Sequence, residues 1–250
     1  KCFIGIDAGT SGIKVVVFDV LGKVRGTGYH ECDVITPRPG WVEQDPRELW
    51  RACSAAVKMA IGSAGAAIEV GGIGFSGQMQ GCLLVDRNLE PIGNCIIWLD
   101  QRSSAQVDEI CRLITDDEAL HLTSNHCLNS FWAPKLLWMR ENEPENFRKI
   151  AKIMLPKDYV NYMLTGTHGC DYSDASGMLL LDVKHKRWSP EMLEICGISE
   201  EQMPRLYESY EKVGTVKPEI AALLGIPADT VVVAGAGDNA AAAVGTGTVG

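Results

Sequence analysis

The sequence has little positive charge, no closely spaced cysteine pair and no long apolar run. Its 250 residues include 23 Lys and Arg against 32 Asp and Glu, a formal net charge of −9. This balance disfavours nucleic acid and anionic membrane surfaces as partners. No apolar run approaches the ~20 residues that a membrane span needs, and we expect no signal peptide before the first strand. The nine cysteines lack C-x-x-C spacing, which is typical of reduced, buried thiols, so we expect a cytoplasmic protein.

The first sixty residues predict three strands followed by a helix. Apolar runs at 2–7 and 13–19, with a third strand after the turn at 21–23, indicate an antiparallel meander. A helix is expected from Asp45 onward, because Asp45 can cap it, Pro46 suits its first position and Glu48 follows the cap by three residues.

The rest of the chain alternates strands with helices, so we expect an α/β protein. Residues 103–165 are expected to be mainly helical, and Gly166 closes a helix that Pro156 opens. The expected strands and short helices lie at 70–76, 81–86, 95–99, 189–195, 199–203 and 217–224, with a last strand and helix within 231–245.

The turn between the first two strands can hold phosphate. It contains Gly9, Thr10 and Ser11, whose backbone N–H groups and hydroxyls can form an anion-binding concavity. Asp7, at the end of the strand before it, is a candidate to hold Mg²⁺ through water. The alternative is an ordinary hairpin, since glycine and threonine are common in turns.

A second polar turn, "FSGQMQG" at 75–81, joins two expected strands. The amides of Gln78 and Gln80 can donate to and accept from a hydroxyl-rich ligand. Met79 between them offers an adaptable apolar wall for the carbon face of a sugar. The alternative is a polar hairpin loop without a ligand.

The stretch "VVVAGAGDNAAAAVG" at 231–245 matches the dinucleotide pattern G-x-G-x-x-A, yet Asp238 lies where a phosphate would sit. A carboxylate there repels pyrophosphate, and too few residues follow for the acid that binds a ribose. We expect instead that the turn presents Asp238 at a helix N-terminus, where it can accept a proton from a hydroxyl, with Asn239 holding the same ligand. The alternative is that Asp238 only caps the helix.

These motifs resemble the N-terminal domain of the FGGY carbohydrate kinases, and most closely their xylulokinase branch. The resemblance covers nearly the whole chain and rests on several blocks in the family's order. They are "FIGIDAGTSGIKVVVFD", "PRPGWVEQDPRELW", "GFSGQMQG", "IIWLDQRS", "APKLLWMRENEPE", "MLPKDYVNYMLTG", "DYSDASGMLLLDV" and "AGAGDNAAAAVG".

The resemblance implies an actin-like ATPase fold, a ribonuclease-H-like lobe with a mixed sheet flanked by helices and helical insertions. It implies that Asp238 is the catalytic base, that Asp7 is the acid associated with Mg²⁺, and that the turn at 9–11 contacts the phosphates of ATP. It also implies that Met79 and Gln80 contact the sugar.

The chain departs from the branch at two positions. Gln80 stands where His is usual, and Trp132 replaces the usual Thr. We expect both positions to lie where the substrate is recognised, which leaves the exact sugar open.

We therefore expect an ATP-dependent kinase, with D-xylulose as the first candidate substrate and another ketopentose or polyol as the alternative. Two further alternatives are a non-catalytic sugar-binding relative and an NAD-dependent oxidoreductase. The chain has no initiator Met and stops within "GTGTVG", so we expect residues 1–250 to be the sugar-binding, catalytic domain of a longer protein. The nucleotide-binding lobe would then be missing, and the exposed surface could form a homodimer.

Overall fold

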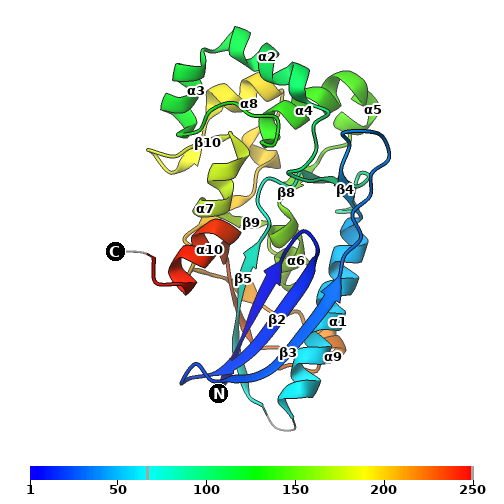
Figure 1. Cartoon of the computed structure of the whole chain (residues 1–250), viewed down its shortest axis with the longest axis vertical. Helices are drawn as coiled ribbons and strands as arrows, with labels where there is room; N and C mark the ends of the chain where they lie inside the picture. Colours follow the sequence, from blue (N-terminus) through cyan, green and yellow to red (C-terminus); the bar gives the residue numbers. More distant parts are fainter. Residues whose placement is uncertain (66–67, 249–250) are drawn as a thin grey trace.

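A computed structural model describes residues 1–65 and 68–248 of the chain. A twisted sheet and the helix α1 form one end of the molecule, and most of the shorter helices gather at the other end (Figure 1). Within the described residues, no helix has both the length and the hydropathy that crossing a membrane requires.

The central sheet is mixed and has the strand order β13-β14-β5-β1-β2-β3, with β15 also paired to β5. The expected meander is confirmed, because β1 pairs antiparallel with β2 and β2 with β3. Strand β5 lies parallel to β1 on its other side and also parallel to β14 and β15. The strands are β1 (Cys2–Ala8), β2 (Gly12–Asp19), β3 (Val24–Glu31), β5 (Val70–Gly77), β13 (Lys212–Thr215), β14 (Val231–Val233) and β15 (Ala236–Gly237).

Helix α1 (Pro46–Ala64) packs closely on the meander. Its start is as expected, since the Asp45 side chain accepts a hydrogen bond from Arg47 N. The expectation that Glu48 contributes to the cap is wrong, because its carboxylate accepts a hydrogen bond from Asp33 N instead. The contact with β3 requires Gly28, where an added Cβ would lie 2.0 Å from the carbonyl oxygen of Ala56.

The other end of the molecule is built from helices and two-stranded sheets around a second core. The helices besides α1 are α2 (Ser104–Leu113), α3 (Asp116–Thr123), α4 (Trp132–Asn142), α5 (Pro144–Phe147), α6 (Pro156–Thr165), α7 (Tyr172–Ala175), α8 (Pro190–Cys196), α9 (Pro218–Leu224) and α10 (Asp238–Gly245), with 3₁₀ turns at Ser176–Met178 and Glu200–Gln202. Of these, α6 and α9 pack against α1 at the core of the central sheet, and α10 lies beside β5. The short strand pairs are β4 (Glu43–Gln44) with β7 (Cys95–Ile96), β6 (Leu83–Val85) with β8 (Lys152–Met154), β9 (Gly169–Asp171) with β12 (Arg205–Tyr207), and β10 (Leu181–Asp182) with β11 (Arg187–Trp188).

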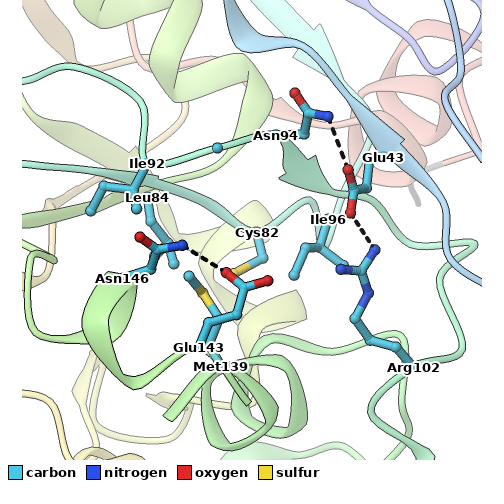
Figure 2. A pocket seen from close by; sticks show the side chains of 11 residues that line it. Glu43, Cys82, Leu84, Ile92, Asn94, Ile96, Arg102, Met139, Glu143 and Asn146 are labelled. Atoms are coloured by element: carbon cyan, nitrogen blue, oxygen red, sulfur yellow. Dashed lines mark hydrogen bonds and ion pairs between the residues drawn. The ribbon is translucent and has the colours of Figure 1, made fainter. Parts of the chain in front are cut away.

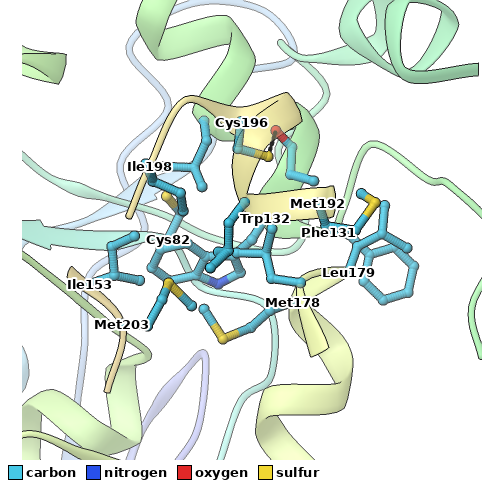
Figure 3. Close-up of a cluster of buried hydrophobic side chains, with 14 of the residues drawn as sticks. Cys82, Phe131, Trp132, Ile153, Met178, Leu179, Met192, Cys196, Ile198 and Met203 are labelled. Atoms are coloured by element: carbon cyan, nitrogen blue, oxygen red, sulfur yellow. Dashed lines mark hydrogen bonds between the residues drawn. The ribbon is translucent and has the colours of Figure 1, made fainter. Parts of the chain in front are cut away.

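Trp132 lies at the centre of this second core. Its side chain is fully buried among Met178, Met192 and other apolar groups (Figure 3). The expectation that Trp132 lies where the substrate is recognised is therefore wrong, because the side chain has no exposed surface and fills space between packed helices. The replacement of the usual Thr by Trp132 therefore changes the packing of the core and not the ligand site.

Candidate active site

Asp238 is the first residue of α10 and follows the short strand β15, which pairs with β5. Helix α10 lies beside β5 (Figure 1). The Asp238 side chain is exposed, and its Oδ1 accepts a hydrogen bond from Asn239 N at 2.7 Å. The helix-cap alternative is thus partly realised, but only toward the adjacent residue, and the carboxylate still faces solvent.

A cavity of about 230 Å³ lies at this helix N-terminus. It is lined by Met79, Gln80, Trp98, Asp238 and Asn239, and we call it the Met79 cavity. Four of these five residues were predicted as ligand contacts from two motifs about 160 positions apart, and the structure brings them together. The lining combines a carboxylate, two amides and two apolar surfaces, as hydroxyl-rich ligands require.

Trp98 is the lining residue that sequence reasoning missed. Its side chain is 43% exposed, which is unusual for so large an aromatic group, and its Nε1 donates to Thr10 Oγ1 at 3.0 Å. The strand expected over 95–99 ends at Ile96, so Trp98 lies beyond the paired residues and projects to the cavity. An aromatic residue at the end of a short strand was the available signal.

Gln80 has a left-handed backbone, with φ of 67°, a conformation that costs a non-glycine residue free energy. The buried ammonium of Lys135 donates to the carbonyl oxygens of Gln80 and Ser130, each at 2.7 Å. Burial lowers the pKa of Lys135 to about 8. Lys135 therefore holds the loop that carries Gln80 in place.

Gln78 does not line the Met79 cavity. Its side chain is 2% exposed; its Oε1 accepts from Thr10 Oγ1 at 3.1 Å and its Nε2 donates to Gln44 Oε1 at 2.6 Å. Gln44 Nε2 in turn donates to Thr10 O at 2.7 Å. The amide expected to contact substrate is occupied by these internal bonds and connects the two loops.

The turn at Gly9, Thr10 and Ser11 joins β1 to β2 as predicted, and Gly9 N donates to Gly12 O at 3.1 Å. The hydroxyl proton of Thr10 is used by Gln78, so the remaining groups available to an anion are backbone N–H groups and the Ser11 hydroxyl. Ser11 is exposed, and its carbonyl oxygen accepts from the Tyr29 hydroxyl.

Asp7 lies near the end of β1, in register with Lys14 on β2 and Ser76 on β5. Its side chain is exposed and borders a hollow of about 740 Å³ between the sheet and α10, which also touches Ala240 and Ala241. We call it the sheet-face hollow. Helix α10 thus lines both spaces: Asp238 faces the Met79 cavity, and the next turn faces the hollow that Asp7 borders.

A further hollow of about 310 Å³ lies away from the predicted site residues (Figure 2). Its polar groups are already paired: Glu43 with Arg102 at 2.6 Å and Asn94 at 2.9 Å, and Glu143 with Asn146 at 2.9 Å. Paired side chains leave little for a ligand, so the Met79 cavity is the better candidate site.

The two glycines of the G-x-G-x-x-A pattern serve close packing. Gly235 has φ of +80°, and an added Cβ would lie 2.5 Å from the carbonyl oxygen of Phe75. An added Cβ at Gly237 would lie 2.9 Å from Met79 Sδ. Because neither glycine has a side chain, the turn that carries Asp238 can approach β5 and the loop that follows it.

A sequence profile of the FGGY family of carbohydrate kinases, N-terminal domain, matches residues 2–245. The chain belongs to this family. It is 42% identical over 249 residues to the xylulose kinase of Escherichia coli (strain K12), covering 99% of this chain and 50% of that protein. It is 38% identical over 251 residues to the xylulose kinase of Bacillus subtilis (strain 168), covering 99% and 50%.

Solved structures of FGGY kinases confirm the fold expected from the resemblance. The xylulose kinase of Rhodospirillum rubrum has a TM-score of 0.96 at 26% identity, covering 99% of this chain and 51% of that one. A crystal structure described as a xyloylose kinase from Brucella ovis has a TM-score of 0.94 at 40% identity, covering 100% and 51%. The chain is an actin-like ATPase lobe and spans about half the length of the relatives it matches. The oxidoreductase alternative is excluded by this family membership.

Proposed function

We propose that the chain is the sugar-binding and catalytic part of an ATP-dependent kinase that converts D-xylulose to D-xylulose 5-phosphate. The observation that carries the proposal is the position of Asp238, an exposed carboxylate at the N-terminus of α10 on the wall of the Met79 cavity. Relatives named xylulose kinases support the choice of sugar. Another ketopentose or polyol remains the alternative substrate, because Gln80 departs from the family pattern.

The lining residues divide the work on the sugar. Met79 and Trp98 offer apolar surfaces to the carbon face, while the amides of Gln80 and Asn239 bond its hydroxyls. Asp238 accepts the proton of the hydroxyl that is to be phosphorylated, and the oxygen then attacks the γ-phosphorus of ATP. The proton moves to a carboxylate oxygen, and the bond from the γ-phosphorus to the leaving ADP oxygen breaks.

The turn at 9–11 and Asp7 fit the phosphates and their metal. The Ser11 hydroxyl and the turn's backbone can contact phosphate oxygens, and Asp7 presents a single exposed carboxylate to the sheet-face hollow. One carboxylate acting through water is a usual arrangement for Mg²⁺. Among the residues that the structure describes, no group of three or more His, Cys, Asp or Glu side chains could hold a metal. When bound, Mg²⁺ would offset the charge on the transferred phosphoryl group.

The adenosine part of the nucleotide is proposed to bind residues outside these 250, because the chain spans only about half of its relatives. On this view residues 1–250 form the N-terminal domain and bind ATP weakly when alone. Calorimetry that gave these residues the same ATP affinity as the natural full-length gene product would contradict the proposed division.

The test of function is a phosphorylation assay of the natural full-length gene product over a panel of pentuloses and polyols, with ADP release as the readout. We expect D-xylulose to give the highest kcat/KM. A higher value for another sugar would establish the alternative substrate. Binding of D-xylulose without ADP release would establish the non-catalytic sugar-binding relative.

We also propose a homodimer and a cytoplasmic location. The sheet-face hollow has exposed apolar lining, including Val244 at 67% exposure, and such surfaces favour association. All nine cysteines are free thiols and eight are buried, as suits a reducing compartment. Sedimentation velocity and cell fractionation test the two proposals separately.

A further inference from the structure

A buried cluster of four charged side chains lies beneath the turn that carries Asp238. The ammonium of Lys157 is 2.5 Å from Asp158 Oδ1, 3.1 Å from Asp171 Oδ1 and 3.7 Å from Asp174 Oδ2. Each of the four side chains is at most 2% exposed. They come from the start of α6, the end of β9 and the short helix α7. Nothing in the proposed reaction uses them directly.

The cluster has more acids than its one cation can balance. Burying an unpaired carboxylate costs several kcal/mol, so such a group is normally neutralised or paired. Burial raises the pKa of Asp174 well above its usual range; the neighbouring carboxylates of Asp158, Asp171 and Asp238 raise it further, against the opposing effect of Lys157. Lys157 stays charged, because its three carboxylate neighbours outweigh the effect of burial on its pKa. The protonated form of Asp174 is therefore favoured relative to that of a free carboxyl group.

Hydrogen bonds from the cluster reach both ends of the turn that carries Asp238. Lys157 Nζ donates to the carbonyl oxygen of Ala234 at 3.3 Å, at the start of the turn. Asp171 Oδ2 accepts from Ser173 Oγ at 2.5 Å, and Ser173 Oγ accepts from Gly237 N at 3.1 Å. Gly237 directly precedes Asp238, so both ends of the turn are bonded to one charged cluster.

We propose that Lys157, Asp158, Asp171 and Asp174, acting through Ser173, form the element that positions Asp238 for proton transfer. The inference rests on the proposed role of Asp238 as the base. A carboxylate on an exposed helix N-terminus has no buried partner of its own, so its placement is fixed through the backbone of the turn. Misplacing a catalytic group by about 1 Å can cost about 10²-fold in rate.

The decisive variant is Ser173→Ala in the natural full-length gene product. It removes the one hydroxyl that connects Asp171 to Gly237 N and leaves the cluster's charges in place. We expect kcat to fall by about 10- to 100-fold while the KM for the sugar changes by less than about threefold. Ser173→Thr keeps a hydroxyl and should restore most of kcat.

Ser176→Ala is the matched control, because the Ser176 hydroxyl donates to the carbonyl oxygen of Ser173 at 2.7 Å in the same helical segment. It loses one local hydrogen bond but none to the Asp238 turn, so kcat should stay near the wild-type value. An equal loss of kcat in Ser173→Ala and Ser176→Ala would overturn the proposal, as would an unchanged kcat in Ser173→Ala.

Amide exchange provides a readout that does not need activity. Ser173→Ala should speed hydrogen exchange at Gly237 N, and Ser176→Ala should not; unchanged exchange in Ser173→Ala would overturn the proposal. The two failures are distinguishable: a wild type that phosphorylates none of the sugars defeats the proposed function. If the wild type is active and Ser173→Ala leaves kcat unchanged, only the positioning role is contradicted.

Discussion

The ammonium of Lys135, on α4, lies 2.7 Å from the carbonyl oxygen of Gln80, in a loop 55 residues earlier in the chain. Lys135 has no exposed surface, and Gln80 has a positive φ. The bond therefore compensates a strained backbone at the wall of the Met79 cavity. A buried cation thus helps to set the shape of the proposed sugar site without facing the sugar.

Replacing Lys135 by Met should loosen that loop. Met fills a similar volume but cannot donate to Gln80 O, and a lost charge-assisted bond of about 1.5–3 kcal/mol predicts a sugar KM raised about tenfold or more. The ATP KM should change little. Steady-state kinetics of the full-length gene product tests this, with Lys152→Met as control, because Lys152 makes a similar bond to Glu201 O away from the cavity.

The pH dependence of the sugar KM provides a second test of Lys135. Burial lowers its pKa to about 8, so the amine is charged below that pH and neutral above it. A neutral amine donates more weakly, and the sugar KM should rise as the pH passes 8 in wild type but not in Lys135→Met. The same rise in both proteins would assign it to another group.

Asp238→Asn keeps the size of the side chain and removes its ability to accept a proton. If Asp238 is the base, kcat should fall by about 10²–10⁴-fold while the affinity for the sugar changes little. Rapid-quench kinetics and direct sugar binding on the full-length gene product measure the two quantities. A near-normal kcat would require another base.

We expect Gln80 to contribute to the specificity of the enzyme for its sugar. Its amide offers two donors and one acceptor, whereas neutral His offers one of each. A hydroxyl that loses its partner leaves a buried polar group at a cost of about 1–3 kcal/mol, so Gln80→Ala should raise the KM for the true substrate by more than about tenfold. Gln80→His should move the ranking of pentuloses toward D-xylulose and leave the ATP KM unchanged. If no sugar in the panel distinguishes the three proteins, Gln80 is structural.

Asp174→Asn should change how stability depends on pH. Burial raises the pKa of Asp174 well above that of an unfolded carboxyl group, so the folded protein binds this proton more tightly and the free energy of unfolding falls as the pH rises above ~4. One proton contributes a slope of about 1.4 kcal/mol per pH unit until the raised pKa is passed. Asn mimics the protonated acid and should remove this fall in the free energy of unfolding above pH ~4 in denaturant titrations. The exposed Asp108 on α2, changed to Asn, serves as control.

Much of the fold follows from local sequence patterns. The meander, the Asp45 cap and the helix between Pro156 and Gly166 were predictable because each depends on residues adjacent in the chain. The strand expected over 95–99 was too long, since its partner β4 has only two residues and the chain turns away to place Trp98.

The site was predictable only in part. Motifs predicted Asp7, Asp238 and the loop with Met79 and Gln80 as site residues, but not the internal bonds of Gln78, which depend on Gln44 from a distant segment. The buried cluster around Lys157 was not predicted either. Its charged residues come from three elements, and in the sequence they resemble ordinary surface residues. Trp132 was misplaced because a substitution in a motif does not reveal whether the side chain faces a ligand or a core.

Thr10 Oγ1 accepts a hydrogen bond from Trp98 and donates one to Gln78. These two bonds connect the wall of the Met79 cavity to the turn at 9–11. A ligand that rotates the Trp98 indole breaks its bond to Thr10 Oγ1 and alters the hydroxyl next to the proposed phosphate contacts. A sugar in the Met79 cavity would then change the affinity of the turn at 9–11 for the nucleotide. By thermodynamic reciprocity, the nucleotide would change the affinity for the sugar by the same factor. The Thr10 hydroxyl is the contact through which sugar and nucleotide would influence each other's affinity.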